Sequence, residues 1–71
     1  MTVEAADGSG FTWEIVRSAD RGFDASFRIE RRVGGQAYAE SGALHALSRE
    51  TAIGWLRAEA AVRGFDGRVV K

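Results

Sequence analysis

The chain has no cysteine, no proline and only one histidine, His45. Without cysteine it forms no disulfides, and a single histidine does not make a usual zinc site, so we expect no metal or other cofactor. No apolar run approaches the roughly 20 residues that a membrane span needs, and we expect no association with membranes. Residues 1–10 also lack the apolar core of a signal peptide, which predicts a cytoplasmic location.

Neither sign of charge predominates, because ten basic residues balance ten acidic ones. No long-range field therefore favours nucleic acid or an anionic surface as a partner. The basic residues are arginines apart from one lysine, and alanine and glycine are abundant, a bias typical of GC-rich bacterial genomes. The 71 residues suffice for one domain with a small core. Such domains, when they lack disulfides and metals, commonly depend on tight packing or on a partner subunit.

Hydrophobic alternation divides the chain into a lead-in and one domain. Residues 1–10 are small, polar and acidic, and they predict a flexible lead-in to a single domain over residues 11–71. From Phe11 onward apolar and polar residues alternate with the period of two that a strand requires. The alternation predicts antiparallel strands over residues 11–18, 25–33 and 37–43.

The link Asp20-Arg21-Gly22 predicts a three-residue hairpin loop between the first two strands, with Gly22 at positive φ. A loop centred on Arg21 pairs Trp13 with Ile29. The same register places Ile15 opposite Phe27 and Glu14 opposite Arg28, so that apolar residues meet on one face and an opposite-charge pair forms on the other, which supports the assignment.

The second turn, at Gly34-Gly35, leaves two registers open for the third strand. A two-residue loop places Tyr38 and Glu40 on the core face. A three-residue loop places small residues there instead, and it moves Tyr38 to the open face beside Arg28 and Arg32. We favour the three-residue loop, because small residues let a helix approach the sheet closely. These small residues are Ala37, Ala39, Ser41 and Ala43.

The segment from Ser48 to Gly64 carries the start and stop signals of one helix, spanning Arg49 to Arg63. Ser48 is a favourable N-cap, and Gly64 suits the left-handed conformation that ends many helices. The expected fold class is α+β, a three-stranded antiparallel sheet packed on one helix (β-β-β-α), with a short C-terminal fourth strand as an optional addition. The predicted core consists of Trp13, Ile15, Phe27, Ile29, Leu47, Ile53, Leu56 and Ala60.

Three helix residues, Trp55, Ala58 and Val62, lie to one side of the stripe that faces the sheet. They are either buried by a wide sheet or exposed as an apolar patch. Aromatic residues are enriched at protein interfaces, and Gly54 on the same helix allows another backbone to approach. We take these three residues as candidates for binding a partner, either a second copy in a homodimer or another protein.

Arg28 and Arg32, together with Tyr38, are the alternative site. Arginines pair with phosphates and a tyrosine ring stacks on bases, so these residues predict a nucleic-acid-binding face on the open side of the sheet. Glu14, Glu30 and Glu40 are predicted on the same face and offset this charge. Nucleic acid therefore ranks behind a protein partner.

The order of three strands, a helix and a short strand over residues 11–70 resembles that of the HicB-like antitoxin domain of bacteria. The resemblance implies an antitoxin-like regulatory role and carries no residue assignments, since the proline-containing loop of that family is missing here. The chain also has neither a phosphate-binding glycine motif nor a catalytic scaffold around His45. We predict a small non-enzymatic protein-interaction module that self-associates, with a nucleic-acid-binding or antitoxin-like domain as the alternative.

Overall fold

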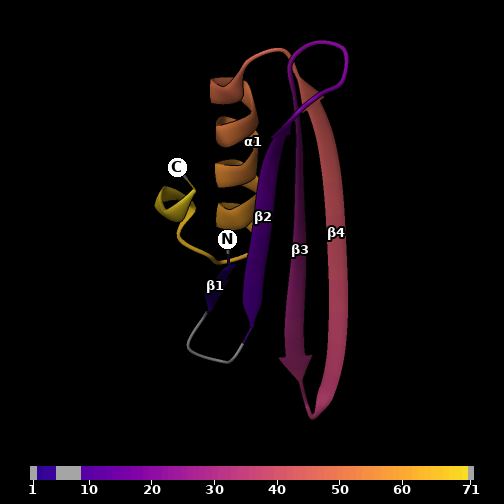
Figure 1. Ribbon diagram of the computed structural model, residues 1–71. Helices are drawn as coiled ribbons and strands as arrows, with labels where there is room; N and C mark the ends of the chain where they lie inside the picture. Colours follow the sequence, from indigo (N-terminus) through magenta and orange to yellow (C-terminus); the bar gives the residue numbers. More distant parts are fainter. Residues whose placement is uncertain (1, 5–8, 71) are drawn as a thin grey trace.

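The computed structural model describes residues 2–4 and 9–70 and shows an antiparallel sheet with one helix on one of its faces (Figure 1). The sheet is a four-stranded meander in the order β1-β2-β3-β4. This arrangement confirms the α+β class and the three-stranded sheet followed by a helix. The strands are β1 (Thr2–Glu4), β2 (Gly10–Arg17), β3 (Phe23–Val33) and β4 (Gln36–Ala46), the helix is α1 (Arg49–Val62), and a 3-10 turn η1 (Gly67–Val69) follows.

The fourth strand comes from the N-terminal part of the chain and not from the C-terminal part. β1 pairs antiparallel with β2, so part of the predicted lead-in belongs to the sheet, while residues 5–8 lie outside the described residues. Within the described residues, which end at Val70, no C-terminal strand forms. Instead η1 packs on α1, Phe65 and Val70 are buried, and Arg57 Nε donates to the carbonyl of Val70 at 2.8 Å.

β2 and β3 pair in a register that differs by two residues from the predicted one. Trp13 lies opposite Phe27 and Phe11 lies opposite Ile29, so the predicted pairing of Trp13 with Ile29 is wrong. The observed register stacks the rings of Phe11 and Phe27 with their centroids 5.7 Å apart, and Phe11 is fully buried. This aromatic packing explains the shift. A shift of two residues leaves every side chain on its predicted face.

The two hairpin turns both use glycine at positive φ. The first loop is longer than predicted, because β2 ends at Arg17 and β3 begins at Phe23, but Gly22 has the expected positive φ of 84°. Within the loop, the amide of Ser18 donates to the carbonyl of Gly22 at 3.0 Å. The second loop consists of Gly34 and Gly35 alone, with φ of 58° and 82°. Two positive φ angles are what a type I′ turn needs, and glycine adopts them at low cost.

This two-residue turn sets the register of β4 and overturns the three-residue alternative that the sequence favoured. Tyr38 and Glu40 pair with residues on the helix-facing side of β3, so they face the helix side and not the open face. Gly42 also faces the helix side, opposite Phe27. The four small residues predicted for the core lie on the open face instead.

Helix α1 begins and ends where the sequence predicts, within one residue. The Ser48 hydroxyl accepts the backbone N–H of Thr51 at 3.1 Å. Arg63 is the C-cap, Gly64 has a φ of 87°, and the amide of Phe65 donates back into the last turn at 2.9 Å. This is the Schellman arrangement. Within the described part of the chain, no helix has the length and apolar character needed to cross a membrane.

The core lies between α1 and the sheet and includes most of the predicted residues. Ile15 and Ile53 are only partly buried, and the prediction for Leu47 is wrong, because its side chain is 72% exposed. β4 extends further than predicted, and Ala46 fills the position under the helix. Leu47, next in the alternation, then points outward. The buried apolar residues are Phe11, Trp13, Ala25, Phe27, Ile29, Ala46, Ala52, Leu56, Ala60, Phe65 and Val70.

Candidate interaction surface

β4 forms the long outer edge of the sheet, at the right in Figure 1. Among the described residues, no strand pairs with its outer side. The strand has 11 residues, whereas β1 at the opposite edge has 3. Exposed edges are commonly protected by short length, proline, lysine or a bulge. β4 has no proline or lysine, and it pairs with β3 without interruption from Gln36 to Ala46, so it lacks these protections.

Every second residue of β4 directs its backbone N–H and C=O groups toward the open edge. In a two-residue hairpin the residues that flank the loop, here Val33 and Gln36, exchange hydrogen bonds, and hydrogen-bonded pairs then alternate along the strands. The even-numbered residues of β4 therefore bond to β3. The residues that point their backbone groups outward, with their side chains on the open face, are Ala37, Ala39, Ser41, Ala43 and His45.

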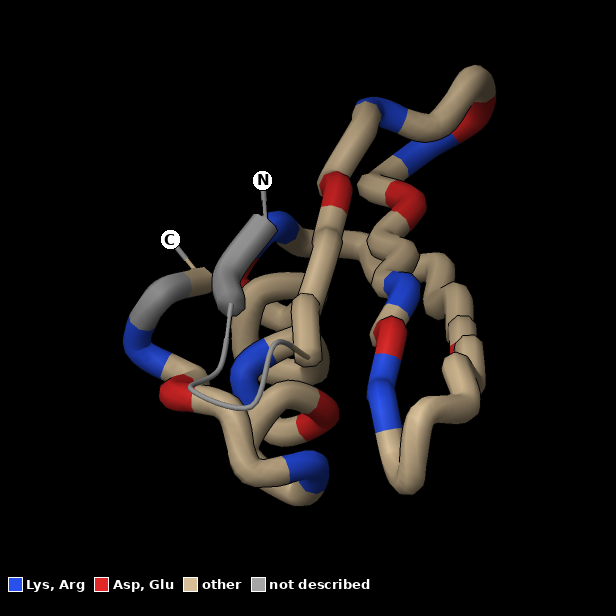
Figure 2. The backbone as a smooth tube through the Cα atoms, turned by 90° about the horizontal axis from the view of Figure 1, so that it is seen from below, with Lys and Arg blue, Asp and Glu red and all other residues tan. Residues whose placement is uncertain are grey.

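β4 carries little charge. β3 carries charged residues of both signs, while the β4 tube in Figure 2 is almost entirely tan, because Glu40 is its one acidic residue and it has no Arg or Lys. Arg63, at the end of α1, donates to the Glu40 carboxylate from Nε at 2.8 Å and also contacts Glu59. Hydrogen bonding to Arg63 lowers the pKa of Glu40, and hydrogen bonding to Glu40 raises the pKa of Arg63. The acidic residue of β4 is thus paired with an arginine at the end of α1.

Of the three predicted partner-binding residues, Trp55 lies on the side of α1 that faces β4, while Ala58 and Val62 are exposed. Glu59 and Arg63 follow Trp55 at intervals of four residues, and Arg63 reaches β4 through Glu40. Trp55 is partly buried, with its ring 5.5 Å from that of Phe27 between centroids. Trp55 therefore belongs partly to the core of the domain.

Beyond Trp55, the helix edge is open to solvent. Ala58 is exposed, and the side chain of Val62 is 81% exposed. On the helix-facing side of β4, Leu44 is partly buried and Tyr38 is 55% exposed. We call Tyr38, Leu44, Trp55 and Val62 the apolar strip. It lies beside the open edge of β4, so unpaired backbone groups and apolar side chains occur on the same side of the molecule.

The open face of the sheet holds only part of the predicted nucleic-acid site. Arg28 and Arg32 lie there, but the register of β4 places Tyr38 on the opposite face, which corrects the predicted grouping. The Arg28 guanidinium contacts the Glu30 carboxylate at 3.4 Å. Glu30 therefore offsets the charge of Arg28, and the tyrosine predicted beside the arginines belongs to the opposite face.

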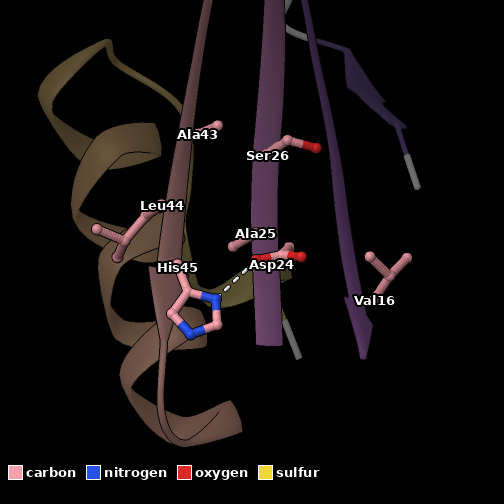
Figure 3. Close-up of a pocket in the computed structure, with 7 residues that line it drawn as sticks. All are labelled: Val16, Asp24, Ala25, Ser26, Ala43, Leu44 and His45. Carbon is pink, nitrogen blue, oxygen red and sulfur yellow. Dashed lines mark hydrogen bonds and ion pairs between the residues drawn. The ribbon is translucent and has the colours of Figure 1, made fainter. Parts of the chain in front are cut away.

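His45 lies on the same open face, in a hollow of about 350 Å³ (Figure 3). Its Nδ1 is 2.8 Å from a carboxylate oxygen of Asp24, the residue directly opposite on β3. Both side chains are about half exposed. The Ser26 hydroxyl points away from the imidazole in Figure 3, so the hollow does not assemble a nucleophile with a base. Over residues 2–4 and 9–70, no cluster of three potential metal ligands occurs.

No family model, no curated protein and no solved structure matches this chain. The class of protein is accordingly given by its own fold, a small α+β domain with a meander sheet and one helix. Its most distinctive surface is the open β4 edge with the adjoining apolar strip.

Proposed function

We propose that the protein is a small non-enzymatic interaction module that self-associates through its β4 side. The observation that carries this proposal is the 11-residue open edge of β4 next to the apolar strip. Interfaces combine buried apolar area with satisfied hydrogen bonds. This side of the molecule offers both, because its outward backbone groups are available to another strand and Val62 is largely exposed.

The size of the surface is compatible with this role. A specific interface buries about 1,200 Å² or more in total. Each copy would then contribute about 600 Å², roughly an eighth of its 4889 Å² of accessible surface. A small domain without disulfides has little stability to spare, so burial of this area favours the assembled state.

Two other observations support a non-enzymatic role in the cytoplasm. The one imidazole of the chain, His45, is half exposed on an open sheet face, whereas catalytic groups act most strongly where water is excluded. A chain without cysteine also does not depend on an oxidising compartment.

Sedimentation equilibrium from low to high micromolar concentration tests the proposal. We expect the average mass to rise toward that of a dimer. Val62→Glu should weaken the association, because it places a charge in the apolar strip. Val16→Glu is the matched control, since Val16 is 44% exposed on the open face of β2 and should leave the association unchanged. A wild-type protein that stays monomeric at high micromolar concentration contradicts the proposal.

The alternative, a nucleic-acid-binding or antitoxin-like regulatory domain, stays a prediction. It depends on Arg28 and Arg32 alone, because Tyr38 faces the other way. Titration with DNA and RNA at low salt tests it. Binding that weakens in the double variant Arg28→Ala/Arg32→Ala, with a flatter salt dependence, would favour this alternative.

A further inference from the structure

We infer that the partner is a second copy of this chain and that the two β4 strands pair antiparallel, with Ser41 opposite Ser41. The two four-stranded sheets then join into one continuous sheet. This inference rests on the proposed self-association and specifies the contact that forms it. The two-fold axis passes between the two Ser41 residues, perpendicular to the sheet.

The outward-facing backbone groups of β4 fix the register. Two antiparallel strands exchange hydrogen bonds only where outward-facing residues of both strands meet. The outward-facing residues run from Ala37 to His45 and are centred on Ser41. With Ser41 opposite itself, Ala39 meets Ala43 and Ala37 meets His45. All of the outward groups are then used, which gives about ten hydrogen bonds between the copies.

The side chains fit the same register. On the helix-facing side Tyr38 lies opposite Leu44 of the other copy, and Glu40 lies opposite Gly42. Large residues therefore meet smaller ones, and no two like charges are directly opposite. Glu40 also keeps the Arg63 guanidinium of its own chain.

The two nearest registers are less favourable. If the two-fold axis is moved from Ser41 to Glu40, the Glu40 carboxylates of the two copies lie directly opposite each other, which is destabilising. If the axis is moved to Gly42 instead, the Glu40 carboxylate lies opposite Leu44 of the other copy, and Tyr38 no longer meets Leu44. The Ser41 register avoids both faults.

The pairing also covers the apolar strip. A two-fold axis perpendicular to the sheet leaves both helices on the same face. In each copy α1 packs mainly on β3. The two β3 strands are separated by three strand spacings of about 4.8 Å each, so the two helix axes would be about 14 Å apart. Helices in direct contact are about 8–10 Å apart. The remaining space suits the larger side chains of the strip, above all Trp55 and Tyr38.

Disulfide trapping tests this register, since the chain contains no cysteine of its own. Ser41→Cys should form an intermolecular disulfide under mild oxidation, because opposite residues in a hydrogen-bonded pair have Cα atoms about 5.5 Å apart. Ala39→Cys is the matched control. The two copies of residue 39 would lie about 13 Å apart along the strands, too far for a disulfide. A mixture of Ala39→Cys and Ala43→Cys should cross-link as a heterodimer.

Amide hydrogen exchange adds a measurement without a cysteine. The amides of Ala39, Ser41 and Ala43 should exchange more slowly as the protein concentration rises, while those of their even-numbered neighbours are already protected by β3. A dimer in which Ser41→Cys does not cross-link overturns the inference and leaves self-association standing. A monomer at all concentrations overturns both. Cross-linking of Ala39→Cys alone would also contradict the register.

Discussion

Replacing Gly42 with alanine tests both the register of β4 and the packing under Trp55. An added Cβ at Gly42 would lie 2.7 Å from Cε1 of Phe27, closer than such atoms approach in real structures. The Phe27 ring has little room to move, because it stacks on Phe11 and contacts Trp55. The substitution should therefore overpack the core.

Two opposing terms set the size of the effect. Overpacking a core costs about 1–3 kcal/mol, while replacing glycine with alanine gains about 0.4–1 kcal/mol by restricting the unfolded chain. The middle values of the two ranges leave a net loss of about 1.3 kcal/mol. Each kcal/mol lowers Tm by about 4–8 °C in a domain of this size. In the three-residue-loop register Gly42 would face solvent, and the same change would stabilise the protein.

Thermal and urea unfolding, followed by circular dichroism at a concentration below the association range, measures this difference. Gly54→Ala is the matched control. Nothing lies within 4 Å of a Cβ added at Gly54 in the exposed face of α1, so this variant should gain about 1 kcal/mol. The two alanine substitutions should thus change the free energy of unfolding in opposite directions. If both stabilise the protein to the same degree, the ring of Phe27 does not cover Gly42 and the described register is refuted.

Three further substitutions have directions set by the structure, and unfolding experiments check each. Leu56→Ala removes a fully buried side chain and should cost about 3–5 kcal/mol; a loss under 1 kcal/mol would contradict its central position. Gly64→Ala forces alanine to a φ of 87° and should cost about 1–2 kcal/mol. Hydrogen bonding to Arg63 lowers the pKa of Glu40 from 4.5, so the ionised carboxyl stabilises the fold above that value and stops doing so as pH falls through its folded pKa. Glu40→Gln should therefore reduce the loss of stability on acidification, and an unchanged acid profile would show that the pair contributes nothing.

Local signals in the sequence predicted the helix, three of the four strands, and the buried faces of β2 and β3. The Ser48 cap and the Gly64 exit depend only on neighbouring backbone groups, and both are present in the structure. The alternation from Phe11 onward also depends only on the pleat of a strand. An error of two residues in register does not disturb it, which is why most of the predicted core is buried although the pairing of Trp13 was wrong.

The favoured register of β4 is wrong because it follows from the packing of the helix on small residues and not from the geometry of the turn. Small residues under a helix are a plausible general solution, but the two positive φ angles at Gly34-Gly35 decide the loop length. The sequence contained this signal. The small residue that the helix side does require is Gly42, which lies under the Phe27 ring.

The candidate surface was only partly visible in the sequence. Helix periodicity separates Trp55 and Val62 from the core stripe, and Trp55 lies on the side that faces β4. Whether a strand lies at the edge of the sheet is not a local property, because it depends on the order of all the strands. The contribution of β1 to the opposite edge left no clear signal in residues that read as a polar lead-in. The sequence alone therefore could not show that β4 is the long open edge.

The two edges of the sheet differ in a way that favours a closed dimer over open-ended assembly. An open edge of 11 residues with Glu40 as its one acidic residue is a template for pairing with another strand and is a liability in a monomer. Pairing about a two-fold axis at Ser41 uses the outward groups of both copies at once, so no third copy can add at that edge. Among the described residues, the edges that remain are the two β1 strands, which are 3 residues long, and the part of each β2 strand beyond the three residues that pair with β1. Symmetric pairing thus removes the exposed edge and leaves only short ones, which do not propagate a sheet.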